Sequence, residues 1–291
     1  MSILFFQALM NGFMLAGLYC LISAGVTLIF GVMHIVNFAQ GAFLMLGAYM
    51  LYYMLTLFGF DFYTSFVLAV LIVGVLAILT ERYLYHRFWL SGAVLPCLVV
   101  SIGLTQVMQN GALLVFGINE KSVDSVFSGV IDIFGMRFSF ERFMIIVFAY
   151  LIIVALMVFL KTSKRGQAMR AVAQDYDAAR LLGINTKRIA MLGMFIGVGL
   201  SAVAGAIIAP VFSVNAYMGE FWMLKAFLVI VIGGLGSVPG AIYAAFLIGF
   251  VESFGLTYFG HITNVFLFVI VMLVLLVKPT GLFSGTVFQI R

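Results

Sequence analysis

Charged side chains are scarce in this sequence of 291 residues. Only 9% of the residues are Asp, Glu, Lys or Arg and 65% are hydrophobic, whereas a soluble domain carries about 25% charged residues. A soluble fold of this size could not bury so much apolar side chain. The sequence therefore predicts an integral membrane protein. Because hydrocarbon offers no partner to a free peptide group, the expected fold class is all-α, a polytopic bundle of transmembrane helices.

Several patterns that carry chemistry are also missing. The sequence has no Gly-x-x-x-x-Gly-Lys-[Ser/Thr] phosphate loop, and its glycine-rich run GGLGSVPG contains no lysine. His34, His86 and His261 are scattered, and neither Cys20 nor Cys97 is near a histidine in sequence, so no metal site is predicted. No Ser, His and Asp arrangement indicates nucleophilic catalysis. We expect no enzyme activity, no metal and no cofactor bound by this chain itself.

Long apolar runs recur along the whole chain. A helix needs roughly 20 apolar residues to cross about 30 Å of hydrocarbon. The second run is broken early by polar residues, and the seventh carries Glu220 and Lys225 before a glycine-rich stretch. Either could be a half-helix, so we expect eight or nine spans in one transmembrane domain of residues 1–291. The candidate spans are residues 8–32, 37–58, 63–84, 93–116, 142–160, 189–212, 218–234, 240–258 and 262–277.

Loop charge predicts the orientation, since Lys and Arg are retained on the cytoplasmic side. The loop 161–188 holds seven Lys and Arg against Asp175 and Asp177, which indicates a cytoplasmic loop. The segment 117–142 is slightly acidic and is expected outside. Counting spans from these loops gives an N-terminus outside and a C-terminus in the cytoplasm.

Two glycine-flanked breaks suggest distant internal copies. GVMHIVNFAQG, residues 31–41, and GGLGSVPG, residues 233–240, each interrupt an apolar run that resumes with Gly-Ala. Transporters often place broken helices at equivalent positions of two repeats, near the substrate path. The alternative is that both are ordinary tight turns between helices.

Polar side chains inside the spans are candidates for a translocation path. An ionisable group there costs about 2–3 kcal/mol on insertion scales, so it needs a partner or a wet cavity. The ordinary alternative is hydrogen bonding between helices, worth roughly 0.6 kcal/mol. Glu252 is either a protonated group in helix packing or part of the path. The candidate path residues are His34, Asn37, Gln40, Glu220 and Glu252.

The most informative segment is GQAMRAVAQDYDAARLLGIN, residues 166–185. It reads as one short helix outside the bilayer, with Met169, Val172, Tyr176 and Ala179 on an apolar stripe. Gly183 follows and suits a left-handed position after the helix. Such a helix could rest on lipid headgroups, or it could dock into a partner protein.

Asp177-Ala178-Ala179, followed after three residues by Gly183, is similar to the Glu-Ala-Ala-x-x-x-Gly loop of bacterial ATP-binding cassette (ABC) importer permeases, with Asp in place of Glu. The chain further resembles the branched-chain amino acid permeases of the high-affinity importer family. Four blocks in the family's order carry this resemblance: GLYCLISAGVTLIFGVMHIVNFAQGAFLMLGAY, GQAMRAVAQDYDAARLLGINTKRIA, KAFLVIVIGGLGSVPGA and LLVKPTGLF.

The resemblance implies that the loop helix inserts into a groove on a cytoplasmic ATPase and passes on nucleotide-driven motion. The expected function is the permease subunit of an ABC importer for branched-chain or related amino acids, multi-pass in the bacterial inner membrane. The expected partners are ABC ATPase subunits that bind ATP-Mg, a second permease and an external substrate-binding protein, with no nucleic acid. The alternatives are a stand-alone secondary transporter or channel, or an ABC permease for urea or another small polar solute. The implied coupling residues are Arg170, Tyr176, Asp177, Ala178, Ala179 and Gly183.

Overall fold

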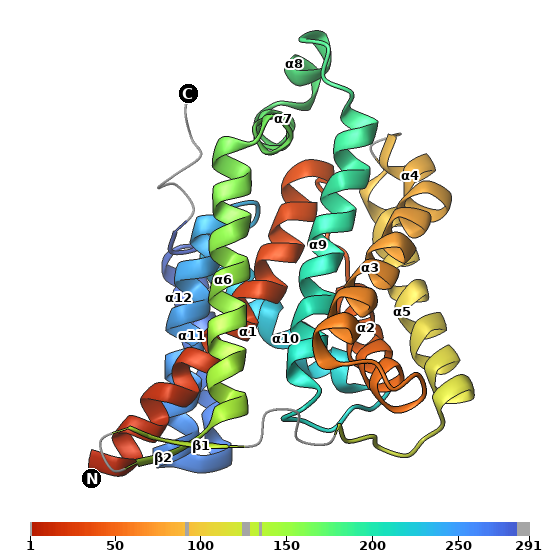
Figure 1. Cartoon of the computed structure of the whole chain (residues 1–291). Helices are drawn as coiled ribbons and strands as arrows, with labels where there is room; N and C mark the ends of the chain where they lie inside the picture. The colour runs from red at the N-terminus through yellow and green to blue at the C-terminus, as the bar shows by residue number, and fades with distance from the viewer. Residues whose placement is uncertain (1, 91–92, 124–128, 134–135, 284–291) are drawn as a thin grey trace.

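The computed structural model describes residues 2–90, 93–123, 129–133 and 136–283, which form a bundle of helices (Figure 1). Two short strands, β1 (Val130–Ile133) and β2 (Met136–Ser139), form an antiparallel hairpin with Val130 opposite Ser139. The helices are α1 (Ser2–Met33), α2 (Gln40–Thr56), α3 (Phe62–Thr80), the π-helix η1 (Glu81–Tyr85), α4 (His86–Leu90), α5 (Val94–Phe116), α6 (Phe140–Thr162), α7 (Lys164–Gln174), α8 (Tyr176–Leu181), α9 (Thr186–Ile208), α10 (Met218–Gly233), α11 (Val238–Phe259), the 3-10 helix η2 (Gly260–Ile262) and α12 (Thr263–Val277).

The predicted spans correspond in order to α1, α2, α3, α5, α6, α9, α10, α11 and α12. Within the described residues, six helical stretches are long and apolar enough to cross a membrane. The helices α2, α10 and α12 are shorter, with 17, 16 and 15 residues. The all-α polytopic bundle is thus confirmed. The hairpin was not anticipated, and the third span runs on through η1 to Trp89 instead of ending near residue 84.

The centre of the bundle is packed through small residues. Helix α9 contributes the run 197–206, which is buried except at Gly199. A Cβ at Gly205 would overlap the Leu44 carbonyl oxygen on α2, and one at Gly197 would lie 2.7 Å from the Gly25 carbonyl oxygen on α1. Small residues allow helix backbones to approach this closely. The small residues of this run thus bring α9 into close backbone contact with α1 and α2.

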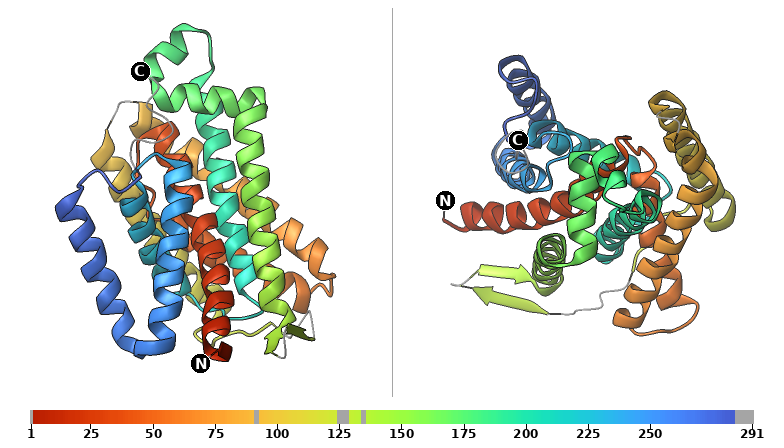
Figure 2. Two further views of the ribbon diagram at one scale, coloured as in Figure 1. Left: turned by 90° about the vertical axis from the view of Figure 1, so that its left-hand side faces the viewer. Right: turned by 90° about the horizontal axis from the view of Figure 1, so that it is seen from above.

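The two ends of the bundle carry different segments. The N-terminus and the β hairpin lie at one end, and α4, α7 and α8 lie at the other (Figure 1). Helices α11 and α12 run side by side and join through η2 at the hairpin end (Figure 2). The loop expected in the cytoplasm and the loop expected outside therefore lie at opposite ends of the molecule.

Candidate functional site

The segment that resembles the coupling loop forms two helices, so the prediction of one continuous helix is wrong. The chain turns at Asp175, whose extended backbone (φ −153°, ψ 108°) ends α7 and begins α8. The Asp175 carboxylate accepts a hydrogen bond from the Ala178 N–H at 2.9 Å and so caps α8. Helix α7 lies across the end of the bundle (Figure 2) with Met169 and Val172 buried, and the short α8 projects beyond it (Figure 1).

The end of α8 has the predicted left-handed glycine. Gly183 has φ +82°, its N–H donates to the Arg180 carbonyl, and the Ile184 N–H donates to the Ala179 carbonyl. This pair of bonds is the Schellman arrangement, which needs a residue at positive φ. The next helix, α9, is capped by the Asn185 side chain, which accepts a hydrogen bond from the Arg188 N–H.

The tip of α8 exposes apolar side chains. Leu181 and Leu182 are 89% and 81% exposed, and Asp177, Ala178 and Arg180 beside them are exposed too. The sequence pattern gave no special place to these two leucines, because both fall off the buried stripe. An exposed pair of leucines on a projecting turn is the kind of surface that a partner protein buries.

Tyr176 ties α8 to the transmembrane helices. Its ring packs edge-on against Trp89 of α4, with 5.7 Å between ring centroids, and its hydroxyl accepts a hydrogen bond from Thr186 of α9 at 3.1 Å. Arg170, on α7, donates a long 3.5 Å bond to the Lys161 carbonyl. Tyr176 thus contacts both α4 and α9.

The first glycine-flanked break separates α1 from α2 (Figure 1). His34 has φ +55° and is exposed, and Asn37 and Gln40 are fully buried. The Asn37 side-chain oxygen accepts from the Tyr85 hydroxyl at 2.9 Å and from the Ala39 N–H at 3.1 Å. We call Asn37, Gln40 and Tyr85 the amide cluster.

Gln40 connects this cluster to the centre of the bundle. Its side-chain nitrogen donates to the Gly197 carbonyl of α9 at 2.6 Å. Its side-chain oxygen is buried and has no hydrogen-bond partner within the described part of the chain. The structure thus gives both amides contacts with other helices, and a role for them in the path stays a prediction.

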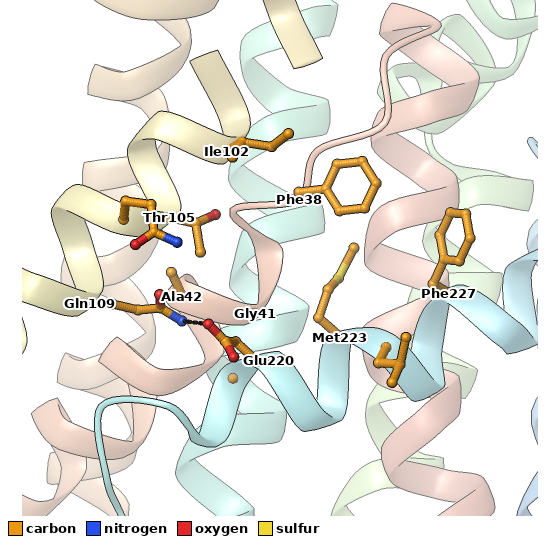
Figure 3. Close-up of a pocket in the computed structure, with 12 residues that line it drawn as sticks. Phe38, Gly41, Ala42, Ile102, Thr105, Gln109, Glu220, Met223 and Phe227 are labelled. Atoms are coloured by element: carbon orange, nitrogen blue, oxygen red, sulfur yellow. Dashed lines mark hydrogen bonds between the residues drawn. The ribbon is translucent and has the colours of Figure 1, made fainter. Parts of the chain in front are cut away.

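Glu220 lines a cavity of about 270 Å³ between α2, α5 and α10 (Figure 3). Its carboxylate accepts a hydrogen bond from the Gln109 side chain at 2.9 Å, and Phe38 and Phe227 stand on the cavity's far side (Figure 3). An exposed stripe runs beside the cavity along one face of α10 at i, i+3, i+4 and i+7. Its members are Tyr217, Glu220, Phe221 and Leu224.

Glu252 forms an ion pair that the sequence analysis missed. Its carboxylate lies 3.0 Å from the Lys225 ammonium of α10 and accepts from the Tyr19 hydroxyl of α1 at 2.7 Å. Lys225 also donates to Asn264 of α12 at 2.7 Å. We call Tyr19, Lys225, Glu252 and Asn264 the ionic cluster. These contacts join α1, α10, α11 and α12, and a role for Glu252 in the path stays a prediction.

The five candidate path residues do not meet at one point. Asn37 and Gln40 lie in the amide cluster at the start of α2, and Glu252 of α11 lies in the ionic cluster. Only Glu220 combines exposure with a cavity between helices. In the described part of the chain, no group of three or more His, Cys, Asp or Glu side chains is placed to hold a metal ion.

Residues 8–277 match the family described as the permease component of branched-chain amino acid transport systems. The high-affinity branched-chain amino acid transport permease protein BraD of Pseudomonas aeruginosa is 31% identical over 96% of this chain and 95% of its own. LivH of Escherichia coli, which carries the same description, is 33% identical over the same shares. The fructose import permease protein FrcC of Rhizobium meliloti is 29% identical over 57% of this chain and 49% of its own. No solved structure matches.

Proposed function

The chain belongs to the family of permease components of branched-chain amino acid transport systems, and from this premise we propose that it is the permease of an ABC importer that carries branched-chain amino acids into the cytoplasm. Members of this family are transport subunits rather than enzymes. ATP-Mg is bound and hydrolysed on separate ATPase subunits. A second permease, identical or paralogous, completes the pore, and an external binding protein delivers the substrate.

Helix α8 is the proposed contact with the ATPase, and this surface is the observation that carries the proposal. The exposed Leu181 and Leu182 supply apolar area, and Asp177 and Arg180 flank them with opposite charges. Tyr176 then links α8 to α4 and α9. Arg170, Ala178, Ala179 and Gly183 complete the coupling segment of residues 161–188.

The exposed stripe of α10 is the proposed wall of the translocation path. A carboxylate on a transmembrane helix is costly against lipid, by roughly 2.5–3.5 kcal/mol on insertion scales, so Glu220 is better placed facing water between two permease subunits. His34 and the amides Asn37 and Gln40 belong to the break beside this cavity. The Gln40 side-chain oxygen, which has no hydrogen-bond partner among the described residues, is an acceptor that a passing substrate could use. In the two-repeat organisation, the second break at 233–240 plays the matching part.

Reconstituted transport tests the proposal. The chain, its partner permease and their ATPases in vesicles should take up leucine only with binding protein outside and ATP inside. Uptake without the ATPases would indicate a stand-alone transporter instead. Fructose and urea serve as competing substrates, because part of the chain resembles a fructose import permease. Uptake of either solute in preference to leucine would overturn the proposed substrate class.

The Schellman turn offers a sharper test of ATPase contact. Gly183→Val should weaken copurification of the ATPase, because a β-branched residue resists φ +82°. Space is not the cause, since a Cβ there would have no atom within 4 Å. Gly183→Asn is the matched control, since Asn tolerates left-handed backbone and should keep the ATPase bound. Equal ATPase recovery from both variants would remove this turn from the coupling site.

Orientation can be tested on the same complex. We expect a cysteine at Gln174 to react with impermeant reagents from the cytoplasmic side alone, and one at Ser122 from the outside alone. Both positions are exposed, and Cys20 and Cys97 are buried. The reverse pattern would place the N-terminus in the cytoplasm and invert the proposed topology.

A further inference from the structure

A second cavity lies on the other flank of the α10 stripe. It measures about 470 Å³ and is bounded by α1, the start of α6, α10 and α11, near the end that carries the N-terminus. Tyr19, Phe221 and Trp222 give it aromatic walls, and Asn11 and Arg142 lie at its polar side. Its volume falls in the range of about 300–1,000 Å³ that is usual for small-molecule sites.

A polar cavity of about 410 Å³ adjoins it. The two cavities share Asn11 and Arg142, and the polar one is also lined by Glu141 and Ser139. A molecule at the junction would therefore meet polar groups on one side and aromatic rings on the other.

Arg142 lies at this junction and has hydrogen-bond donors that no described residue uses. Its only hydrogen bond given by the described residues runs from Nη1 to the Asn11 side-chain oxygen at 3.0 Å, whereas a guanidinium has five N–H groups. No carboxylate of the described residues lies within 4.0 Å of it. Arg142 is also in the first turn of α6, where the helix dipole disfavours a cation. Nothing in the local fold accounts for a half-buried arginine here, which points to an anionic ligand.

Glu141 supplies the opposite charge. Its Oε1 atom is buried and has no hydrogen-bond partner among the described residues, and its side chain lines the polar cavity. Buried acceptors are normally paired. The carboxylate of Glu252 also touches the apolar cavity, but Lys225 and Tyr19 already occupy it. Glu141 is thus the acceptor left for a ligand cation.

We propose that these two cavities together form an outer binding site for a zwitterionic amino acid with an apolar side chain, a step that rests on the function proposed above. The ligand carboxylate meets Arg142 and Asn11, and its ammonium group meets the Glu141 carboxylate. The apolar side chain lies against Tyr19, Phe221 and Trp222. Such a site receives the substrate from the binding protein, and it selects carboxylate-bearing solutes over neutral ones such as sugars or urea.

The chain carries its own probe for this site. It has two tryptophans, Trp89 and Trp222, and only Trp222 lines the cavity. In the purified transporter complex, Trp89→Phe leaves Trp222 as the only tryptophan of this chain. The partner subunits' signal is subtracted with a Trp89→Phe, Trp222→Phe complex. Leucine should then change the Trp222 emission saturably, in phosphatidylcholine nanodiscs without binding protein.

Ligand analogues separate the two charged contacts without altering the protein. Leucinamide, which lacks the carboxylate, and isovalerate, which lacks the ammonium group, should each need at least about tenfold more ligand for half the response, as expected for losing a charge-assisted bond. Arg142→Gln should weaken leucine binding by a similar factor. Arg142→Lys should keep part of the Trp222 response to leucine. Glu141→Gln should weaken the binding of leucine but leave the binding of isovalerate unchanged, because isovalerate has no ammonium group.

Several outcomes would overturn the proposal. These are no leucine response in the parent complex, equal responses to leucine and leucinamide, or a response that appears only with phosphatidylglycerol, which would indicate an anionic lipid site. If Arg142→Gln does not assemble, the analogue series on the parent complex decides. Uptake distinguishes the two levels: a complex that imports leucine without any Trp222 response refutes this site alone, whereas failure of ATP-driven import refutes the proposed function.

Discussion

The amide cluster and the ionic cluster place polar groups in the same apolar bundle by different means. In the amide cluster, Asn37 and Gln40 are neutral and bond to a hydroxyl and to backbone groups around the α1–α2 break. In the ionic cluster, Lys225 and Glu252 are of opposite charge and lie on two neighbouring helices. The first shapes the backbone where a helix is interrupted, and the second joins helices that are already regular.

This difference determines how much stability is lost when a residue of either cluster is replaced. Removing one partner of a buried ion pair leaves an uncompensated charge and costs about 3–5 kcal/mol. Removing a neutral hydrogen-bond partner strands a dipole and costs about 1–3 kcal/mol. Replacing both charges together by groups of similar shape is often neutral. The ionic cluster should therefore be fragile to single changes and tolerant of a paired one.

The largest effect is expected for Lys225→Met, which leaves the Glu252 carboxylate buried beside Tyr19. We expect the free energy of unfolding to fall by about 3–5 kcal/mol. This loss should appear as a lower yield of monodisperse protein and a lower thermal midpoint in detergent. Adding Glu252→Gln should restore most of the loss, since no charge is then left unpaired. A double variant as unstable as Lys225→Met would show that the pair holds the helices by more than charge balance.

A smaller effect is expected from the double variant Asn37→Leu, Gln40→Leu. Asn37→Leu strands the Tyr85 hydroxyl and the Ala39 N–H, at about 1–3 kcal/mol for each group. Gln40→Leu removes the bond to the Gly197 carbonyl, which keeps its own hydrogen bond within α9. Uptake should be abolished. ATPase copurification and thermal midpoint separate the reasons: an assembled complex without uptake supports a role in the path, whereas a lost complex assigns the amides to packing. Normal uptake would exclude both residues from the path.

The smallest effects come from two buried tyrosines that form a matched pair. Tyr19 donates to the Glu252 carboxylate and Tyr85 to the Asn37 amide, and both are fully buried. Tyr19→Phe should lower the free energy of unfolding by about 1.5–3 kcal/mol and Tyr85→Phe by about 0.5–1.5 kcal/mol. The first loss is larger because a hydrogen bond to a carboxylate is stronger than one to a neutral amide. Thermal midpoints of the two variants measure the difference. Equal losses of stability in the two variants would contradict the proposed difference between the ionic cluster and the amide cluster.

Sequence patterns found much of the fold because the bilayer makes a simple demand. The position of each span follows from length and apolarity, and the breaks at 34–39 and 234–237 follow from glycines and polar residues in otherwise apolar runs. Gly183 was found because few residues other than glycine follow a helix at positive φ. The α7–α8 turn was missed, since the 3.6-residue stripe continues through Asp175 and hides the change of direction.

The candidate site was less accessible to sequence reasoning. Glu252 was recognised as costly, but its partner Lys225 lies 27 positions earlier on a different helix, and spacing alone does not tell which helix faces which. Arg142 ends the slightly acidic segment 117–142 in the sequence, and only the bundle places it between two cavities. The exposed leucines at the tip of α8 gave no periodic signal.

The sequence by itself determined that this protein is a helical membrane bundle of the branched-chain amino acid permease family. Hydrophobic runs and motifs each lie within one continuous stretch of residues, so they can be recognised without knowing which helices touch. The tertiary structure alone decided which polar groups meet. It brought Lys225 to Glu252, Asn37 to Tyr85 and Arg142 to the aromatic cavity. These contacts depend on the rotation and depth of each helix. Both depend on close packing at residues such as Gly197 and Gly205, where a Cβ would collide with the backbone of the neighbouring helix.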